Sequence, residues 1–169
     1  PDWKRSFRHE GWFIGDTYNM SIGQGFTQTT PLQLVMATAA IANNGALLKP
    51  RVVKSIIENS TEKSVKNIEP EVLNRDFVDQ KSLEIIRKAM RETIVSGSGR
   101  FLSQLPGGAG GKTGTAETGV GNNTHAWFTV FAPYEDPKIA LTVLGENGGE
   151  GSGVAVPIAR EVLEWYLAR

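Results

Sequence analysis

The residues AWFTVFAPYEDPKIALTVL (126–144) decide the fold, because they hold two β-rich runs on either side of a turn. Aromatic and β-branched residues fill the first run, which is typical of a strand. The segment PYEDP (133–137) supplies turn-forming residues before the second run at 139–144. We therefore expect two antiparallel neighbouring strands. Trp127, Phe128 and Phe131 are expected to build the core and the sheet face rather than a ligand platform.

Three segments outside these strands have helical patterns. Thr30, Pro31 and Gln33 form a capping box at the start of an apolar run, which predicts a helix from 31 to 42 that is buried on all sides. Asp79 can cap a helix from about 80 to 95, which is amphipathic and therefore lies on a surface. Residues 154–167 return to helical spacing and predict a docking helix near the end of the chain, with Pro157 tolerated near its start.

The remaining segments are less regular. Residues 1–26 are rich in aromatics, glycine and turn formers, which predicts loops with one short strand at 20–22. Apolar residues at 52–57 and 65–68 surround a polar turn and predict a solvent-facing hairpin. Together with the strands and helices, this order predicts an α+β layer structure, in which helices pack on the faces of an antiparallel sheet.

Composition excludes several classes of protein. The chain has 169 residues, enough for one domain, and its 18 basic residues balance its 18 acidic ones. Without a basic excess we expect no nucleic-acid partner. The absence of cysteine excludes disulfides and thiolate zinc sites, and no apolar run is long enough to span a bilayer. The chain starts at Pro1 without a methionine or signal peptide, which suggests part of a longer protein.

The run Gly110-Gly111-Lys112-Thr113-Gly114-Thr115 is the strongest candidate for chemistry, since its glycines let another molecule approach the backbone. One interpretation is a phosphate-binding loop, but the first glycine of that pattern falls on Pro106. The residues that follow are also poor helix formers, whereas a helix N-terminus is what holds the phosphates. The other interpretation is the Lys-Thr-Gly strand of serine acyl-transfer enzymes, which lies at a sheet edge beside the site.

Several segments in the same order resemble the transpeptidase domain of class B penicillin-binding proteins, of the elongation type called penicillin-binding protein 2. The resemblance covers nearly the whole chain, and the chain is similar to the back half of that domain. It is carried by PDWK (1–4), GDTYNMSIGQG (15–25), TPLQ (30–33), GKTGTAE (111–117), HAWF (125–128), FAP (131–133) and ENGG (146–149). Residues 1–169 are then the C-terminal portion of one penicillin-binding transpeptidase domain.

Of the three motifs of that family, only the Lys-Thr-Gly run is evident here. The family uses a serine followed three residues later by lysine, a Ser-x-Asn and the Lys-Thr-Gly strand, and no Ser-x-Asn occurs here. Ser60 and Lys63 have the spacing of the first motif, but they fall in the polar turn of the expected hairpin, so we interpret Ser60 as a solvated turn residue. We expect the nucleophile, its lysine and the Ser-x-Asn upstream of Pro1.

The resemblance implies a serine-type peptidoglycan D,D-transpeptidase that attacks a stem peptide ending in D-Ala-D-Ala through an acyl-enzyme. Lys112 would support proton transfer, the Thr113 and Thr115 hydroxyls would bind the substrate carboxylate, Gly114 would give clearance, and the Thr115 amide would serve the oxyanion hole. By itself the fragment is expected to be inactive. β-Lactams would enter the same site, and neither a metal nor a cofactor is expected.

The resemblance also implies a location and partners. The domain would lie outside the cytoplasm, anchored through a missing N-terminal segment. Its partners would be the elongation machinery, namely a polytopic glycosyltransferase and shape-determining membrane proteins. The alternatives are a non-catalytic interaction module and, less favoured, a nucleotide binder.

Other polar residues are expected to have structural roles. His125 should form a strand-end hydrogen bond, since the only other histidine is His9 and no metal-like cluster surrounds it. Glu117 and Asp16 fall in segments rich in glycine and threonine, where carboxylates are ordinarily solvated, so we do not expect them to act as an acid-base pair. Gly23 and Gly25 should permit a tight bend.

Overall fold

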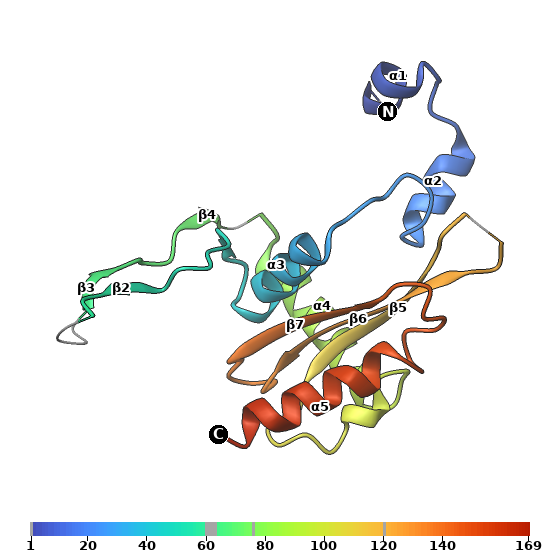
Figure 1. The fold of residues 1–169 in the computed structure, drawn as a ribbon. Coiled ribbons are helices and arrows are strands. Elements are labelled where there is room, and N and C mark those ends of the chain that lie inside the picture. Colours follow the sequence, from blue (N-terminus) through green and yellow to red (C-terminus); the bar gives the residue numbers. More distant parts are fainter. Residues whose placement is uncertain (1, 60–63, 76, 120) are drawn as a thin grey trace.

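A three-stranded antiparallel sheet forms the centre of the molecule (Figure 1). The computed structural model describes residues 2–59, 64–75, 77–119 and 121–169. Strands β5 (Gly110–Glu117), β6 (Thr124–Ala132) and β7 (Ile139–Gly145) lie side by side in that order. Both strand pairs are antiparallel, and the β5–β6 register runs without a break from Gly110 opposite Phe131 to Glu117 opposite Thr124. The two strands predicted from 126–144 are confirmed as neighbours.

Helices cover both faces of this sheet, as the α+β prediction requires. They are α3 (Pro31–Ala42), α4 (Gln80–Val95) and α5 (Ala155–Leu167), with a short 3-10 helix η1 (Arg100–Leu102). Successive side chains of a strand point to opposite faces. Phe128 and Val130 of β6 therefore pack with Leu163 of α5 and Leu102 of η1, whereas Phe131 packs with residues of α3 and α4.

Helix α3 begins as its sequence predicts but is less buried than expected. The Thr30 hydroxyl accepts a hydrogen bond from the Gln33 amide at 3.2 Å, and the Gln33 side chain accepts one from the Thr30 amide at 2.9 Å. Within the helix, however, only Thr38, Ala40 and Ala42 are buried, and Leu32 is 53% exposed. The prediction of burial on all sides is wrong, because the sheet contacts one side of the helix, and Pro31, Leu32 and Val35 line an open hollow beside β7.

The N-terminal segment is helical, so the prediction of loops with a strand at 20–22 is wrong. Helices α1 (Asp2–Arg8) and α2 (Ile14–Ser21) project from the body, with α2 near the end of the sheet at which β5 leads on to β6 and α1 farther out (Figure 1). Both are short and lack a continuous apolar stripe. They are held by contacts between distant side chains, above all an ion pair of Lys4 with Asp16, which local sequence patterns do not reveal.

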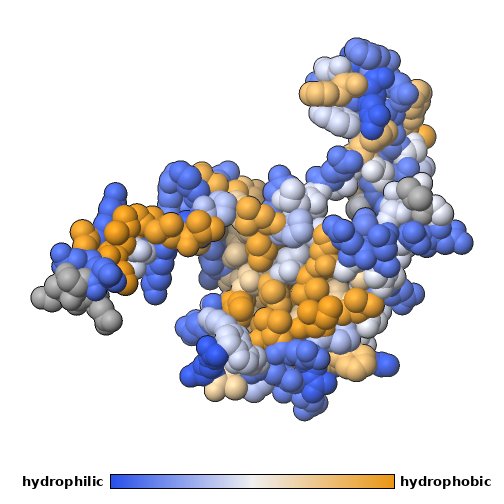
Figure 2. Space-filling model, viewed as in Figure 1, coloured by the Kyte–Doolittle hydropathy of each residue, from blue (hydrophilic) through white to orange (hydrophobic). Residues whose placement is uncertain are grey.

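The solvent-facing hairpin is confirmed in the described residues. Strands β2 (Ser55–Ile57) and β3 (Ser64–Asn67) pair antiparallel, and β1 (Leu47–Leu48) pairs with β4 (Val72–Asn74) closer to the sheet. The hairpin extends away from the body as an arm, along which Figure 2 shows a row of hydrophobic atoms flanked by hydrophilic ones. Ser60 and the rest of the turn at 60–63 lie outside the described residues.

Candidate active site

The Lys-Thr-Gly run lies extended in β5, at the edge of the sheet. β5 pairs with β6 on one side, and no other described strand pairs with its outer edge. In an antiparallel ladder the N–H and C=O of one residue point the same way. The Thr113 carbonyl accepts from the Lys112 ammonium and the Thr115 carbonyl accepts from the Gln24 side chain, so both residues direct their main-chain groups outward. The Thr115 amide is therefore available as a donor at this edge.

Lys112 places its charge on the same edge. Its side chain is exposed, and its Nζ donates to the Thr113 carbonyl oxygen at 2.7 Å. This position puts an ammonium on the same open edge of β5 to which the Thr115 amide points. A cation and an N–H donor that converge on one edge can both stabilise negative charge on a bound ligand.

The two threonines beside Gly114 have different surroundings. The Thr113 hydroxyl is hydrogen-bonded to the Ser98 hydroxyl at 2.6 Å, a partner that the sequence did not indicate. Ser98 comes from the glycine-rich segment after α4, and only the fold brings it to β5. The Thr115 residue is exposed, and its hydroxyl has no partner among the hydrogen bonds of the described residues. Thr115 is thus the better placed of the two to bind a ligand.

A groove of about 750 Å³ runs along the outer edge of β5. One wall is the strand from Lys112 to Thr118, and the other is the segment that joins α2 to α3, from Ile22 to Thr29. His125 and Trp127 of β6 also line it. A groove of this size, with an open strand edge and few charges, suits an extended peptide or a small organic ligand.

The strand is supported from behind by close packing. Gly114 lies opposite Trp127, and the backbone of Gly151 packs closely against both residues. A Cβ atom at Gly151 would lie 2.3 Å from the Trp127 carbonyl oxygen and 2.4 Å from the Gly114 oxygen. Thr129, opposite Lys112, is buried and hydrogen-bonds the Thr142 hydroxyl of β7 at 2.9 Å. The edge that faces the groove is therefore part of a rigid sheet.

The structural roles predicted for the other polar residues are partly confirmed. The Nδ1 atom of His125 accepts from the Asn147 amide at 3.1 Å, which is the expected hydrogen bond at a strand end. Gly23 and Gly25 have φ angles of +74° and +71°, as the predicted bend requires. Glu117 is exposed but lies in β5 rather than in a turn.

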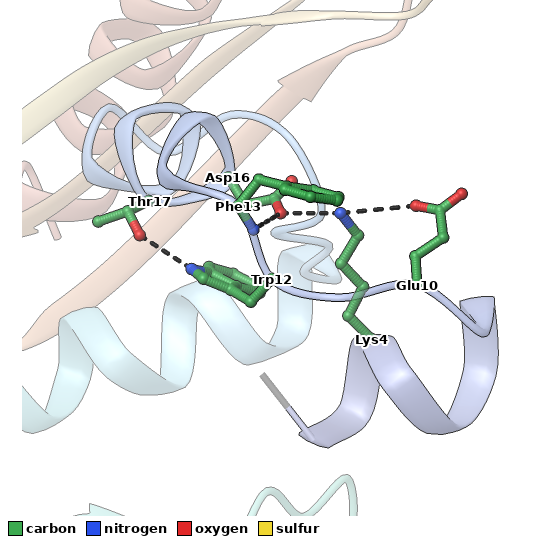
Figure 3. Close-up of polar contacts among 6 residues, drawn as sticks. All are labelled: Lys4, Glu10, Trp12, Phe13, Asp16 and Thr17. Atoms are coloured by element: carbon green, nitrogen blue, oxygen red, sulfur yellow. Dashed lines mark hydrogen bonds and ion pairs between the residues drawn. The ribbon is translucent and has the colours of Figure 1, made fainter.

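Asp16 was expected to be solvated, and this is wrong. Its carboxylate lies 2.7 Å from the Lys4 ammonium and also accepts the Phe13 amide at 2.8 Å, as Figure 3 shows. The hydrogen bond from Lys4, followed by the one from the Phe13 amide, lowers the pKa of Asp16 below its ordinary value. The Asp16 carboxylate therefore holds the N-terminal segment together. Its partner Lys4 is 12 positions away in the sequence, and no local sequence pattern indicates this pairing.

The described residues have the features of neither a phosphate loop nor a metal centre. The glycine-rich run forms a strand and does not lead into a helix, so it has none of the helix-terminal geometry that phosphate loops use. Among residues 2–59, 64–75, 77–119 and 121–169, no cluster of histidine, cysteine or carboxylate residues could hold a metal ion. Over the same residues, no helix has the length and apolarity to cross a membrane.

Comparison with known proteins gives one consistent family. The model described as "Penicillin binding protein transpeptidase domain" matches residues 4–164. The peptidoglycan D,D-transpeptidase MrdA of Haemophilus influenzae is 34% identical over 98% of this chain and 28% of its own length. The chain spans less than a third of the length of the curated relatives that it matches.

Solved structures agree in fold. The crystal structure of Pseudomonas aeruginosa PBP2 in complex with WCK 5153 has a TM-score of 0.82 and 31% identity, over 99% of this chain and 37% of that one. The imipenem acyl-enzyme complex of penicillin-binding protein A from M. tuberculosis has a TM-score of 0.75 and 33% identity, over 88% of this chain and 33% of that one.

Proposed function

The chain belongs to the penicillin-binding protein transpeptidase domain family, and from that membership we propose that it supplies one wall of the active site of a peptidoglycan D,D-transpeptidase. The reaction would be attack of a serine on the D-Ala-D-Ala end of a stem peptide, followed by transfer of the acyl group from the serine to an amine. β-Lactams would acylate the same serine. One observation carries the proposal: the Lys112 ammonium and the outward-facing Thr115 amide both lie at the open edge of β5, beside the groove.

Each residue of the edge has a role in this reaction. The Thr115 N–H would donate to the oxyanion that forms when the carbonyl carbon is attacked, and the Lys112 charge would favour proton transfer from the serine. The Thr115 hydroxyl would bind the substrate carboxylate. The Thr113 hydroxyl, already paired with Ser98, would reach the carboxylate together with that partner. Gly114 would leave room for the ligand.

The acylated serine and its lysine would come from a part of the protein outside these 169 residues, because the chain has no Ser-x-Asn and its one Ser-x-x-Lys starts at Ser60, in the sequence between β2 and β3. The present chain alone would then bind no penicillin covalently. The whole protein would lie on the outer side of the cell membrane, anchored by another segment. There it would work with a polytopic glycosyltransferase and with shape-determining membrane proteins of the elongation machinery.

The test is acylation of the whole protein by a fluorescent penicillin. Lys112→Ala should slow acylation about 100-fold or more, the usual effect of removing one group that stabilises charge in the transition state. Lys138→Ala is a matched control, because Lys138 is an exposed lysine that pairs with Asp136 away from the groove. Melting temperatures of both variants should stay close to wild type. Equal acylation rates for Lys112→Ala and wild type would contradict the role of Lys112.

A non-catalytic module remains the rival, and the Lys112 experiment also decides it. A whole protein that contains Ser-x-x-Lys and Ser-x-Asn motifs before these residues, and that takes up one penicillin per chain, is a transpeptidase of this family. If both motifs are missing and no label is incorporated, the chain belongs to a family member that binds without catalysis.

A further inference from the structure

The loop between α2 and α3 reaches across the groove to the edge of β5. Its Gln24 side chain donates from Nε2 to the Thr115 carbonyl oxygen at 3.1 Å, although the two residues are 91 positions apart. Thr115 is one of the two residues, with Thr113, whose main-chain groups point to the open edge of β5. The contact therefore occupies a hydrogen-bond acceptor in the site itself.

An extended peptide needs the same acceptor. A peptide that joins the edge of a sheet as an extra strand lies about 4.7–4.9 Å from it and donates N–H groups to its free carbonyls. Its donor nitrogen would stand roughly 2.9 Å from the Thr115 oxygen, which is nearly the distance at which the Gln24 nitrogen already lies. The Thr115 oxygen has two lone pairs, but both donors would approach it from the groove at the open edge of β5, so a ligand that uses this carbonyl competes with Gln24.

The main chain of Gln24 is held in place. Its amide donates to the Asn19 carbonyl at 2.9 Å and the Gly23 amide donates to the Met20 carbonyl at 3.0 Å, so the loop closes on the end of α2. The φ angles above +70° at Gly23 and Gly25 permit this closure. The position of Gln24 is thus set by the loop, and displacement is a movement of its side chain.

The loop is in turn tied to a buried lysine on both sides, as Figure 3 shows in part. Before the loop, Asp16 of α2 pairs with Lys4, whose side chain is only 4% exposed. After the loop, the centre of the Phe26 ring lies 5.0 Å from the Lys4 ammonium. The centre of the Phe13 ring, at the N-cap of α2, lies 4.9 Å from the same ammonium. Lys4 therefore connects the segments on either side of residues 23–25, and it fixes the wall from which Gln24 extends.

We propose that Gln24 is a specificity-determining residue, which competes with the N–H of a bound ligand for the Thr115 carbonyl. This rests on the proposed function, because it takes the groove as the acyl-donor site. A ligand with an amide N–H beside its reactive carbonyl competes with the Gln24 contact to gain its own. A ligand without that N–H leaves Gln24 in place. Gln24 thereby lowers the acylation rate of amide-bearing ligands relative to other ligands. The expected effect is that of one neutral hydrogen bond, roughly 2- to 10-fold.

The experiment compares two β-lactams on the whole protein. Penicillin G has an amide N–H next to its lactam ring, and imipenem has a hydroxyethyl group there. Second-order acylation rates are measured with both for wild type, Gln24→Ala and Gln24→Glu, the last of which keeps the shape but removes the donor. Gln28→Ala is the matched control, because Gln28 lines the same groove and forms no hydrogen bond with β5 among the described residues.

The ratio of the penicillin G rate to the imipenem rate should rise roughly 2- to 10-fold in both Gln24 variants and stay at the wild-type value in Gln28→Ala. A ratio unchanged in both Gln24 variants, or one that falls, overturns the proposal while leaving the transpeptidase function intact. If the wild type is acylated by neither compound, the proposed function is wrong and this inference with it. Because the ratio is taken within each variant, a general loss of folded protein does not affect it.

Discussion

Gly151 offers a direct test of the claim that the geometry of β5 determines reactivity. In Gly151→Ala, the new Cβ would lie 2.3 Å from the Trp127 carbonyl oxygen and 2.4 Å from the Gly114 oxygen. Ordinary contact needs 3.4 Å or more, so the β5–β6 backbone must move by roughly 1 Å. Overpacking of this kind costs about 1–3 kcal/mol. For a domain of this size that is a loss of roughly 2 to 12 °C in melting temperature.

The effect on acylation should be larger than the effect on stability. A displacement of about 1 Å at a reacting group can cost on the order of 100-fold in rate. We expect Gly151→Ala in the whole protein to be acylated by penicillin about 100 times more slowly while most of it stays folded at 25 °C. Gly15→Ala is the control, because nothing lies within 4 Å of a Cβ there and alanine favours the helix α2. A Gly151→Ala protein that melts lower but is acylated at the wild-type rate would refute the reasoning.

Three further changes test the supports of the site. Thr30→Ala removes the cap of α3 and should lower the free energy of unfolding by about 0.5–2 kcal/mol in urea titrations. Arg87→Met removes hydrogen bonds to the Ala42 and Tyr134 carbonyls and should cost about 1.5–3 kcal/mol in the same assay, with a smaller loss for Arg87→Lys. The pKa of Asp16 is lowered by Lys4, so its contribution to stability is complete above the unfolded value of 3.8 and is lost as the pH falls through the lower folded pKa. The difference in melting temperature between wild type and Asp16→Asn should therefore shrink in a pH series below about 4.

The central sheet and the helices were predictable because their signals are local. The alternation of residues around Phe128, the turn at 133–137 and the caps at Thr30 and Asp79 act within one element or between neighbours. The extended form of 112–115 at the sheet edge followed from the motif and its resemblance. These are the parts of the fold in which propensity and tertiary packing favour the same structure.

The parts that were missed depend on contacts between distant residues. Helices α1 and α2 are stabilised by Lys4 pairing with Asp16 and by rings around the ammonium, and neither helix has the periodicity that identifies longer ones. The Gln24 contact joins residues 91 positions apart, and the Ser98 contact with Thr113 joins residues 15 apart. The sequence did indicate a tight loop at Gln24, because a glycine lies on each side of it. It did not indicate that this loop lies against β5.

The two walls of the groove are held by different means, and this bears on how the site responds to change. β5 is held by an unbroken ladder with β6 and by the close approach of Gly151, so its geometry depends on main-chain packing. The opposite wall depends on one buried lysine. A buried ion pair contributes little net stability, yet removing one partner leaves an uncompensated charge. Loss of Lys4 would thus leave the sheet intact and release the wall that bears Gln24. The loop that carries Gln24 is therefore held by its own hydrogen bonds to the end of α2 and, at its flanks, by Lys4, a residue that does not line the groove.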